Sequence, residues 1–216
     1  MSQEENVIKF YGICNHLKNV IRKGWLDWNV KRERIESVAE HVYGVQMLAL
    51  AMKFEYQYDI DIKKVLYMLA IHELGETVIG DITQFDMERE EKERIEHEAV
   101  SKILASILDG KQIEELFLEF DERKTKEALF AYQCDKLECD LQSKIYDEEN
   151  CVDVNNQPGN KTLNHPIVKE CLSNGDSFST MWLKFGQSIY PYDENFTAVS
   201  NYAMNNKIKT KKKNTR

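Results

Sequence analysis

The residues of this sequence best suited to chemistry are an adjacent imidazole and carboxylate, His72 and Glu73. The apolar residues before them predict a helix over residues 62–77, and the helical period places Glu73 on its core-facing stripe with Leu66 and Leu69. A buried carboxylate without a partner is strongly unfavourable, so Glu73 requires a paired group or a metal ion. The alternative is a solvent-leaning helix end with a hydrogen-bonded histidine.

Two residues elsewhere in the chain offer the same kinds of ligand. His41 follows the capping-box sequence Ser37–Glu40, and apolar residues of one helical face bracket it, so we expect it to point inward. The free N–H groups of a first helical turn keep its imidazole neutral, which is the form that binds metal. Asp135 lies in a stripe of small or polar residues on a late helix. The alternative to a metal ligand is an aspartate that forms an ion pair with a basic neighbour such as Lys136 or Lys144.

Two imidazoles and two carboxylates on three predicted helices make a candidate cage for a divalent cation. The elements that must position them are helical, because three prolines and nine glycines in 216 residues leave few turns for a many-stranded fold. A hydrophobic content of 42% suits one domain with a sizeable core. The predicted helices span residues 5–20, 37–54, 62–77, 89–108, 112–120, 125–147, 165–172, 176–189 and 194–204. Residues 22–29 are predicted to form a loop.

Composition narrows the class of protein. The formal net charge of −8 argues against a general nucleic-acid binder, which needs a basic surface to neutralise phosphates. Five scattered cysteines without a Cys-x-x-Cys pair are typical of reduced thiols in a cytoplasmic protein. The first residues lack the pattern of a secretory signal, and no apolar run reaches the ~20 residues that span a bilayer. We therefore expect a cytoplasmic protein that binds neither nucleic acid nor membrane.

Three segments resemble the motif segments of the HD-domain metal-dependent phosphohydrolases, nearest the 5′-deoxynucleotidase branch: Ile35–His41, Ala70–Ile82 and Gln133–Lys144. The resemblance covers about residues 13–146. It implies an all-α HD-domain helical bundle that holds one divalent ion, with Mn, Co, Fe and Mg as candidates. The implied metal ligands are His41, His72, Glu73 and Asp135.

The chain departs from the family pattern at one ligand. The second motif is normally His-Asp, whereas this sequence has His72-Glu73 and so a carboxylate that is one methylene longer. The departure affects coordination geometry and metal preference. It also keeps open the hypothesis of a catalytically inactive member, because a fold does not guarantee its chemistry.

The resemblance implies hydrolysis of a phosphomonoester, specifically a (deoxy)nucleoside 5′-monophosphate, by a metal-activated water. Glu76 and Asp81 match the carboxylates that position and deprotonate this water or protonate the leaving oxygen. Their alternatives are a solvated helix end for Glu76 and a turn or helix cap for Asp81. We expect Arg22 to clamp the phosphate, with Lys23 as its substitute, and Trp25 to pack near sugar or base unless it is a core residue.

The remaining expectations concern organisation and competing functions. We expect a hydrolase core over residues 1–148, a loop or insertion over 149–163, a C-terminal helical extension over 164–205 and a basic disordered tail over 206–216. Family habit implies a homodimer. A dinuclear phosphodiesterase or oxygenase is a competing enzyme, although only His97 lies between the second motif and Asp135 to help hold a second metal. The non-enzymatic alternatives are a nucleotide-sensing or scaffold protein and nucleic-acid contact by the tail.

Overall fold

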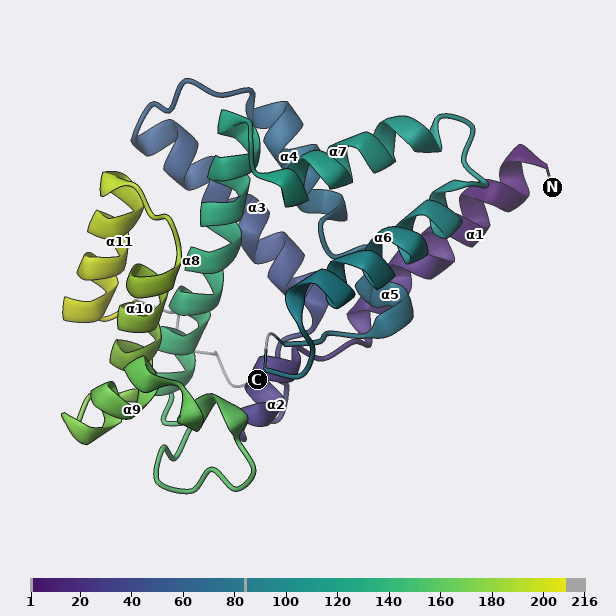
Figure 1. Ribbon diagram of the computed structural model, residues 1–216. Coiled ribbons are helices and arrows are strands. Elements are labelled where there is room, and N and C mark those ends of the chain that lie inside the picture. The colour runs from purple at the N-terminus through teal and green to yellow at the C-terminus, as the bar shows by residue number, and fades with distance from the viewer. Residues whose placement is uncertain (1, 84, 209–216) are drawn as a thin grey trace, which may run out of the picture. The chain divides into compact units, whose positions relative to one another are not determined.

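The structure, a computed structural model, describes residues 2–83 and 85–208, which form helices joined by turns and loops (Figure 1). Over these residues the backbone forms no strand, and an isolated antiparallel bridge joins Ile21 to Ser37. The predicted all-α fold is therefore confirmed. The chain divides into two compact units, one comprising residues 1–26 and 34–135 and the other residues 27–33 and 136–216. The predicted division at residue 148 stays a prediction.

The first unit contains the motif segments as far as Asp135. Its elements are α1 (Gln3–Asn15), the 3-10 helix η1 (His16–Lys18), residues 23–26 of α2 (Lys23–Asp27), α3 (Val38–Glu55), α4 (Ile62–Ile71), α5 (Glu76–Ile79), α6 (Arg89–Leu104), α7 (Gly110–Glu122) and residues 126–135 of α8 (Lys126–Glu148). Helix α3 packs against α4, α7 packs against both α4 and α6, and the short α5 lies against α6 (Figure 1).

Local capping explains where α3 and α4 begin. At α3 the Ser37 hydroxyl accepts the Glu40 N–H at 3.3 Å, and the Glu40 carboxylate accepts the Ser37 N–H at 3.0 Å, which confirms the predicted capping box. Asp61 caps α4 by accepting two backbone N–H groups. The cap of α3 places His41 in the first turn, where it is fully buried as predicted.

Four predicted segments differ from the structure, one of which is the helix predicted over residues 89–108, which ends at Leu104. The helix predicted over residues 62–77 ends at Ile71, and turns over residues 72–75 separate α4 from α5, because hydrogen bonds from residue i+3 to residue i replace the helical pattern there. The predicted loop 22–29 contains α2, whose first N–H, that of Lys23, donates to the Asp81 carboxylate at 2.7 Å. The first helix ends at Asn15 and continues only as the 3-10 turn η1.

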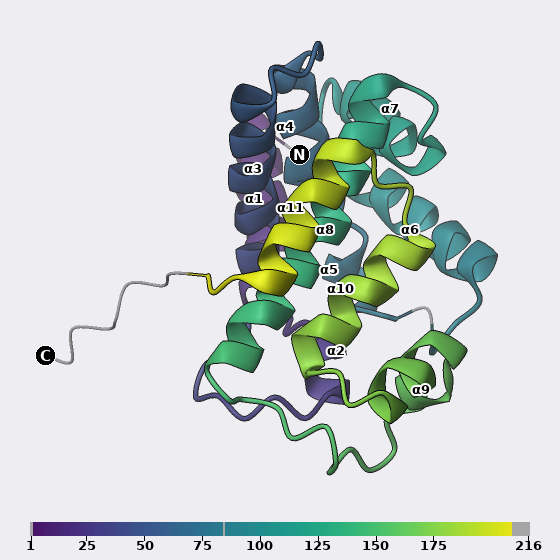
Figure 2. The same ribbon diagram turned by 90° about the vertical axis from the view of Figure 1, so that its left-hand side faces the viewer.

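The second unit consists of residues 136–148 of α8, the 3-10 helix η2 (Lys161–Asn164), α9 (Pro166–Ser173), α10 (Phe178–Ile189) and α11 (Glu194–Asn205). Helix α10 packs against both α9 and α11 (Figure 2). Trp28 and Phe178 are buried in this unit and meet edge to face with ring centroids 5.1 Å apart. The three predicted C-terminal helices are confirmed, whereas the predicted disordered tail lies, from residue 209, outside the described residues.

No helix within residues 2–83 and 85–208 has both the length and the apolar character needed to cross a membrane.

Candidate active site and metal centre

The four predicted metal ligands lie together in the first unit. One ligand atom from each of four side chains lies within 4.8 Å of the others, and the four residues are His41, His72, Glu73 and Asp135. His41 comes from the first turn of α3, the adjacent pair from the turn after α4, and Asp135 from α8. The structure therefore brings together from three helical segments the residues that the sequence analysis grouped.

The hydrogen bonding of His72 tests whether a metal fits this cluster. Its Nδ1 lies 2.9 Å from the carbonyl oxygen of Leu69, and because a carbonyl only accepts, Nδ1 must carry the hydrogen. The buried Nε2 makes no hydrogen bond, although carboxylate oxygens of Glu73 and Asp135 lie 3.5 and 3.8 Å away. A neutral imidazole thus presents a lone pair toward two acceptors, and a cation among them satisfies all three groups.

The other separations agree with a shared ion. His41 Nε2 lies 3.1 Å from Asp135 Oδ1 and 3.7 Å from Glu73 Oε1. Ligand atoms that each lie ~2.1 Å from a common metal are separated by about these distances. Two imidazoles and two carboxylates suit divalent transition metals. The residues present therefore fit a divalent metal ion.

Charged neighbours keep Glu73 in the form that binds metal. Burial raises the pKa of Glu73, but the electrostatic effects of the His72 ring and of the positively charged Arg22 together outweigh burial and lower this pKa to about 2. Arg22 Nη1 donates to Glu73 Oε1 at 3.2 Å. Glu73 is therefore an ionised carboxylate at any pH near neutrality.

Glu76, the first residue of α5, has the opposite electrostatic setting. Its side chain is 1% exposed, and its Oε2 has no hydrogen-bond partner. Burial raises the pKa of Glu76 well above its ordinary value, and the nearby negative charges of Glu73 and Asp81 raise it further. A raised pKa brings a carboxyl group closer to the range in which a general acid–base residue exchanges protons.

The predicted phosphate-binding cations lie beside the cluster. Arg22 contacts Glu73, and its Nε lies 3.8 Å from Asp81 Oδ2, the oxygen that also accepts the Lys23 backbone N–H. The Lys23 ammonium pairs with Asp86 at 3.2 Å. Asp81 thus joins the start of α2 to Arg22. Arg22 thus contacts a predicted metal ligand, Glu73, directly.

Trp25 occupies the core position that the sequence analysis kept as its alternative. It is 2% exposed, and its indole N–H donates to Glu36 Oε2 at 2.7 Å. Its predicted contact with sugar or base stays a prediction.

Lys92 and Glu96 on α6 were not among the site residues predicted from the sequence. Their side chains are only 25% and 15% exposed, and Lys92 Nζ lies 3.7 Å from Glu76 Oε1. Burial raises the pKa of Glu96 to about 7. The available signal was the four-residue spacing between the two, but this spacing is common on solvated helix faces.

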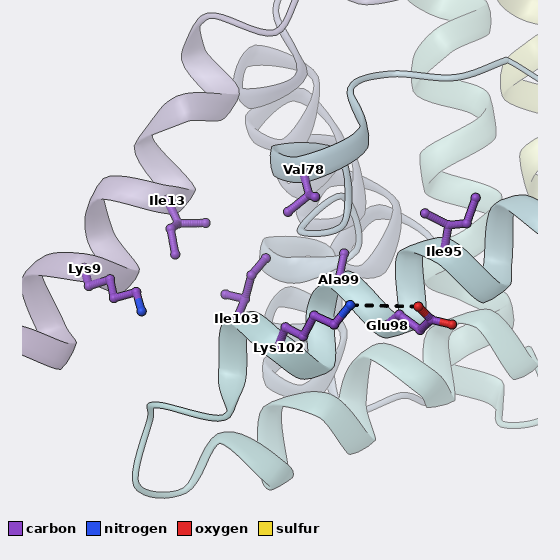
Figure 3. Close-up of a pocket in the computed structure, with 8 residues that line it drawn as sticks. All are labelled: Lys9, Ile13, Val78, Ile95, Glu98, Ala99, Lys102 and Ile103. Atoms are coloured by element: carbon purple, nitrogen blue, oxygen red, sulfur yellow. Dashed lines mark ion pairs between the residues drawn. The ribbon is translucent and has the colours of Figure 1, made fainter. Parts of the chain in front are cut away.

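A separate pocket of about 240 Å³ lies between α1, α5 and α6 (Figure 3). Ile13, Val78 and Ile103 contribute apolar wall, and Lys9 and Lys102 contribute positive charge. None of the predicted site residues lines this pocket. The candidate site is therefore defined by its converging side chains and not by this cavity.

Comparison with known proteins identifies the family. A family profile described as HD domain matches residues 14–170, and the chain belongs to that family. A relative named 5′-deoxynucleotidase HDDC2 from Dictyostelium discoideum is 34% identical over 67% of this chain and 79% of its own. The protein of the same name from Bos taurus is 32% identical over 71% of this chain and 72% of its own. A crystal structure of a predicted metal-dependent phosphohydrolase from Magnetospirillum magnetotacticum shares the fold, with a TM-score of 0.65 and 20% identity over 95% of both chains.

Proposed function

We propose that the protein is a metal-dependent phosphohydrolase that removes phosphate from (deoxy)nucleoside 5′-monophosphates. The observation that carries the proposal is the cluster of four metal-ligating side chains beside a buried acid, Glu76, and a cation, Arg22. The relatives named 5′-deoxynucleotidases support the substrate class.

His41, His72, Glu73 and Asp135 would hold a divalent metal, which would lower the pKa of a bound water and offset negative charge on the phosphoryl group. The water oxygen attacks phosphorus, and the bond from phosphorus to the 5′-oxygen breaks. Glu76 and Asp81 position the water and take its proton, and a proton returns to the 5′-oxygen of the leaving nucleoside. The products are inorganic phosphate and a deoxynucleoside.

Arg22 binds the phosphate. Its planar guanidinium offers several N–H donors in a fork that matches phosphate oxygens. Its contacts with Glu73 and Asp81 orient the side chain before substrate arrives. Lys23 is the substitute if Arg22 serves only to neutralise Glu73. Trp25 of α2 is buried in the core. Its contact with the sugar or base of the substrate is part of the proposal.

The proposed stoichiometry is one ion per chain, with Mn, Co, Fe and Mg as candidates. A single set of four ligands supports one ion, and Glu73 in place of the family's usual aspartate makes metal preference an experimental question. Elemental analysis of the purified chain measures both identity and number. Two ions per chain would favour a dinuclear phosphodiesterase or oxygenase instead.

The decisive test is a phosphate-release screen of deoxynucleoside and ribonucleoside 5′-monophosphates with Mn, Co, Mg and Fe. We expect release that a chelator abolishes. Glu76→Gln should retain the metal and lose about 10²- to 10⁴-fold in rate, the usual contribution of a general acid–base group. No release with any nucleotide and metal would reject the proposal. Nucleotide binding without turnover would favour the sensor hypothesis.

We also propose a homodimer that packs through the exposed face of α3. Tyr43 and Phe54 are 65% and 59% exposed there, with Met47 and Ala51 between them, so the stripe carries no charge. Its helical spacing suits a second copy packed across a twofold axis, which brings the same stripe to both sides. We expect the wild-type chain to sediment as a dimer and Met47→Glu to dissociate it. A wild-type monomer at micromolar concentration would reject this interface.

The cytoplasm is the proposed compartment, and it is supported by the five cysteines, none of which forms a disulfide. The proposed partner is a small phosphate ester and neither nucleic acid nor membrane, which the net charge of −8 supports. Cell fractionation tests the compartment. Retention of the full chain on DNA, lost on removal of residues 207–216, would contradict the choice of partner.

A further inference from the structure

Helix α6 approaches the start of α5 closely at Gly75. A Cβ atom at this position would lie 3.0 Å from both Cβ and Cγ of Glu96 and 3.3 Å from its Cα. These atoms belong to the helix or lie next to it, so they could not move aside cheaply. The missing side chain of Gly75 therefore lets α6 lie directly against the residue that precedes Glu76.

A side-chain contact joins the same two helices. Lys92 Nζ lies 3.7 Å from Glu76 Oε1 and 3.4 Å from Glu96 Oε1. Lys92 and Glu96 are one helical turn apart on α6. Because a largely buried ammonium is costly without counter-charges, the two carboxylates compensate it and hold it between them.

The contact leaves part of Glu76 available for chemistry. Lys92 faces Oε1, whereas the buried Oε2 of the same carboxylate has no hydrogen-bond partner. The backbone N–H of Glu76 also donates to the carbonyl of Glu73 at 3.1 Å, which links its main chain to a predicted metal ligand. Helix α6 therefore determines where Glu76 lies relative to the metal cluster.

We propose that Lys92 is a positioning residue that holds one oxygen of Glu76 so that the other faces the reacting groups, and that Glu96 holds Lys92 in turn. This inference rests on the proposed phosphohydrolase function. It assigns Lys92 and Glu96 a role that acts through Glu76 and not through the metal or the substrate. The expected defect of a Lys92 variant is therefore in turnover and in the order of α5, not in metal binding.

The test compares Lys92→Met with Lys92→Arg and with Lys102→Met, a matched control on the exposed side of the same helix. With the metal-loaded full chain and the best nucleotide, Lys92→Met should lower kcat about 10- to 100-fold, the usual cost of losing a supporting residue, with KM within about twofold. Lys92→Arg should recover most of the loss, and Lys102→Met should match wild type.

A second readout needs neither metal nor turnover. Hydrogen exchange of the α5 amides, such as the Gly80 N–H that bonds to the Glu76 carbonyl at 2.9 Å, should be faster in Lys92→Met and unchanged in Lys102→Met. Wild-type kcat in Lys92→Met, or a defect confined to KM, would overturn the inference. If Lys92→Met does not fold, Glu96→Gln decides, because it should also lower kcat. Wild-type chain without phosphate release would reject the proposed function, and the exchange measurement would still test Lys92.

Discussion

Both compact units of the chain bury carboxylates, but they compensate them differently. The first unit gathers Glu73 and Asp135 beside two imidazoles, with Arg22 in contact. The second unit buries Asp140 on α8, where the Tyr192 hydroxyl donates to Oδ2 at 2.9 Å and Oδ1 has no partner. The first arrangement collects ligands, whereas the second isolates one acid among packed helices.

Close packing around Asp140 separates its carboxylate from solvent. Helix α10 approaches at Gly186, where a Cβ atom would collide with the Asp140 carboxylate. Burial raises the pKa of Asp140 well above its ordinary value, against the opposing effects of Tyr192 and the charge of Lys136. This acid is therefore biased toward its neutral form.

The comparison with Glu73, whose pKa falls to about 2, separates burial from function. Both side chains are withdrawn from solvent, and burial raises the pKa of each. Only Glu73 has enough positive charge nearby to reverse that effect. A buried carboxylate thus indicates a metal site only when imidazoles and cations converge on it.

The strongest test of this difference is the pair Asp135→Asn and Asp140→Asn. We expect Asp135→Asn to lose the metal and to lower phosphate release by at least ~100-fold, because losing a ligand should exceed the usual cost of losing an outer-shell partner. Asp140→Asn should retain both the metal and normal phosphate release. Elemental analysis and initial rates measure the outcomes. A full equivalent of metal and normal turnover in Asp135→Asn would remove the basis for the proposed site.

Part of this site was predictable from helix-capping patterns and from the order of the motif segments along the chain. The capping box at Ser37 predicted where α3 begins and hence that His41 is buried. The order of the three motif segments grouped the four ligands, which no single residue could have done. Their chemistry is visible in sequence because imidazoles and carboxylates are rare on core-facing stripes.

The features that remained unpredictable depend on contacts between distant segments. The break between α4 and α5 accompanies the approach of Glu96 to Gly75, which local propensity does not encode. Lys92 looks like an ordinary surface lysine until α5 is placed beside it. Likewise, the short helix α2 begins where Asp81, far along the chain, accepts its first N–H.

Metal binding should stabilise the first unit directly. A ligand present at 100 times its Kd stabilises the folded state by about 2.7 kcal/mol. We expect added metal to slow hydrogen exchange around His41 and His72 more than around Asp140. Exchange measured with metal and with chelator provides the comparison. Equal protection in both units would contradict a metal site confined to the first.

Glu73→Asp tests whether the longer carboxylate matters. The shorter side chain withdraws its oxygens by ~1.5 Å, about one carbon–carbon bond, from Arg22 and from the imidazoles. We expect metal affinity to fall about tenfold, the low end of the losses seen when ligand positions are perturbed. Titration calorimetry measures it, with Asp140→Asn as a control in the second unit. Tighter binding by Glu73→Asp would mean that Glu73 is not adapted to this site.

The smallest expected effect is the pH dependence of stability in Asp140→Asn. Because folding raises the pKa of Asp140 above its unfolded value of ~3.9, the folded state binds this proton more tightly. The stabilisation that this proton provides is fully present below the unfolded pKa and is lost as the pH rises through the folded pKa. The variant cannot bind this proton and lacks the loss. Its stability relative to wild type should therefore increase with pH, by about 1.4 kcal/mol in total for each unit by which the folded pKa exceeds the unfolded pKa.

Urea unfolding of both chains between about pH 5 and about pH 8 measures the difference. Tyr192→Phe provides the counterpart, since it removes the hydroxyl that favours the ionised acid and should extend the decline in stability to higher pH. A stability difference between Asp140→Asn and wild type that stays constant over this range would mean that Asp140 titrates normally. Burial would then not raise the pKa of Asp140. The difference between the two units would lie only in the metal-ligand cluster around Glu73.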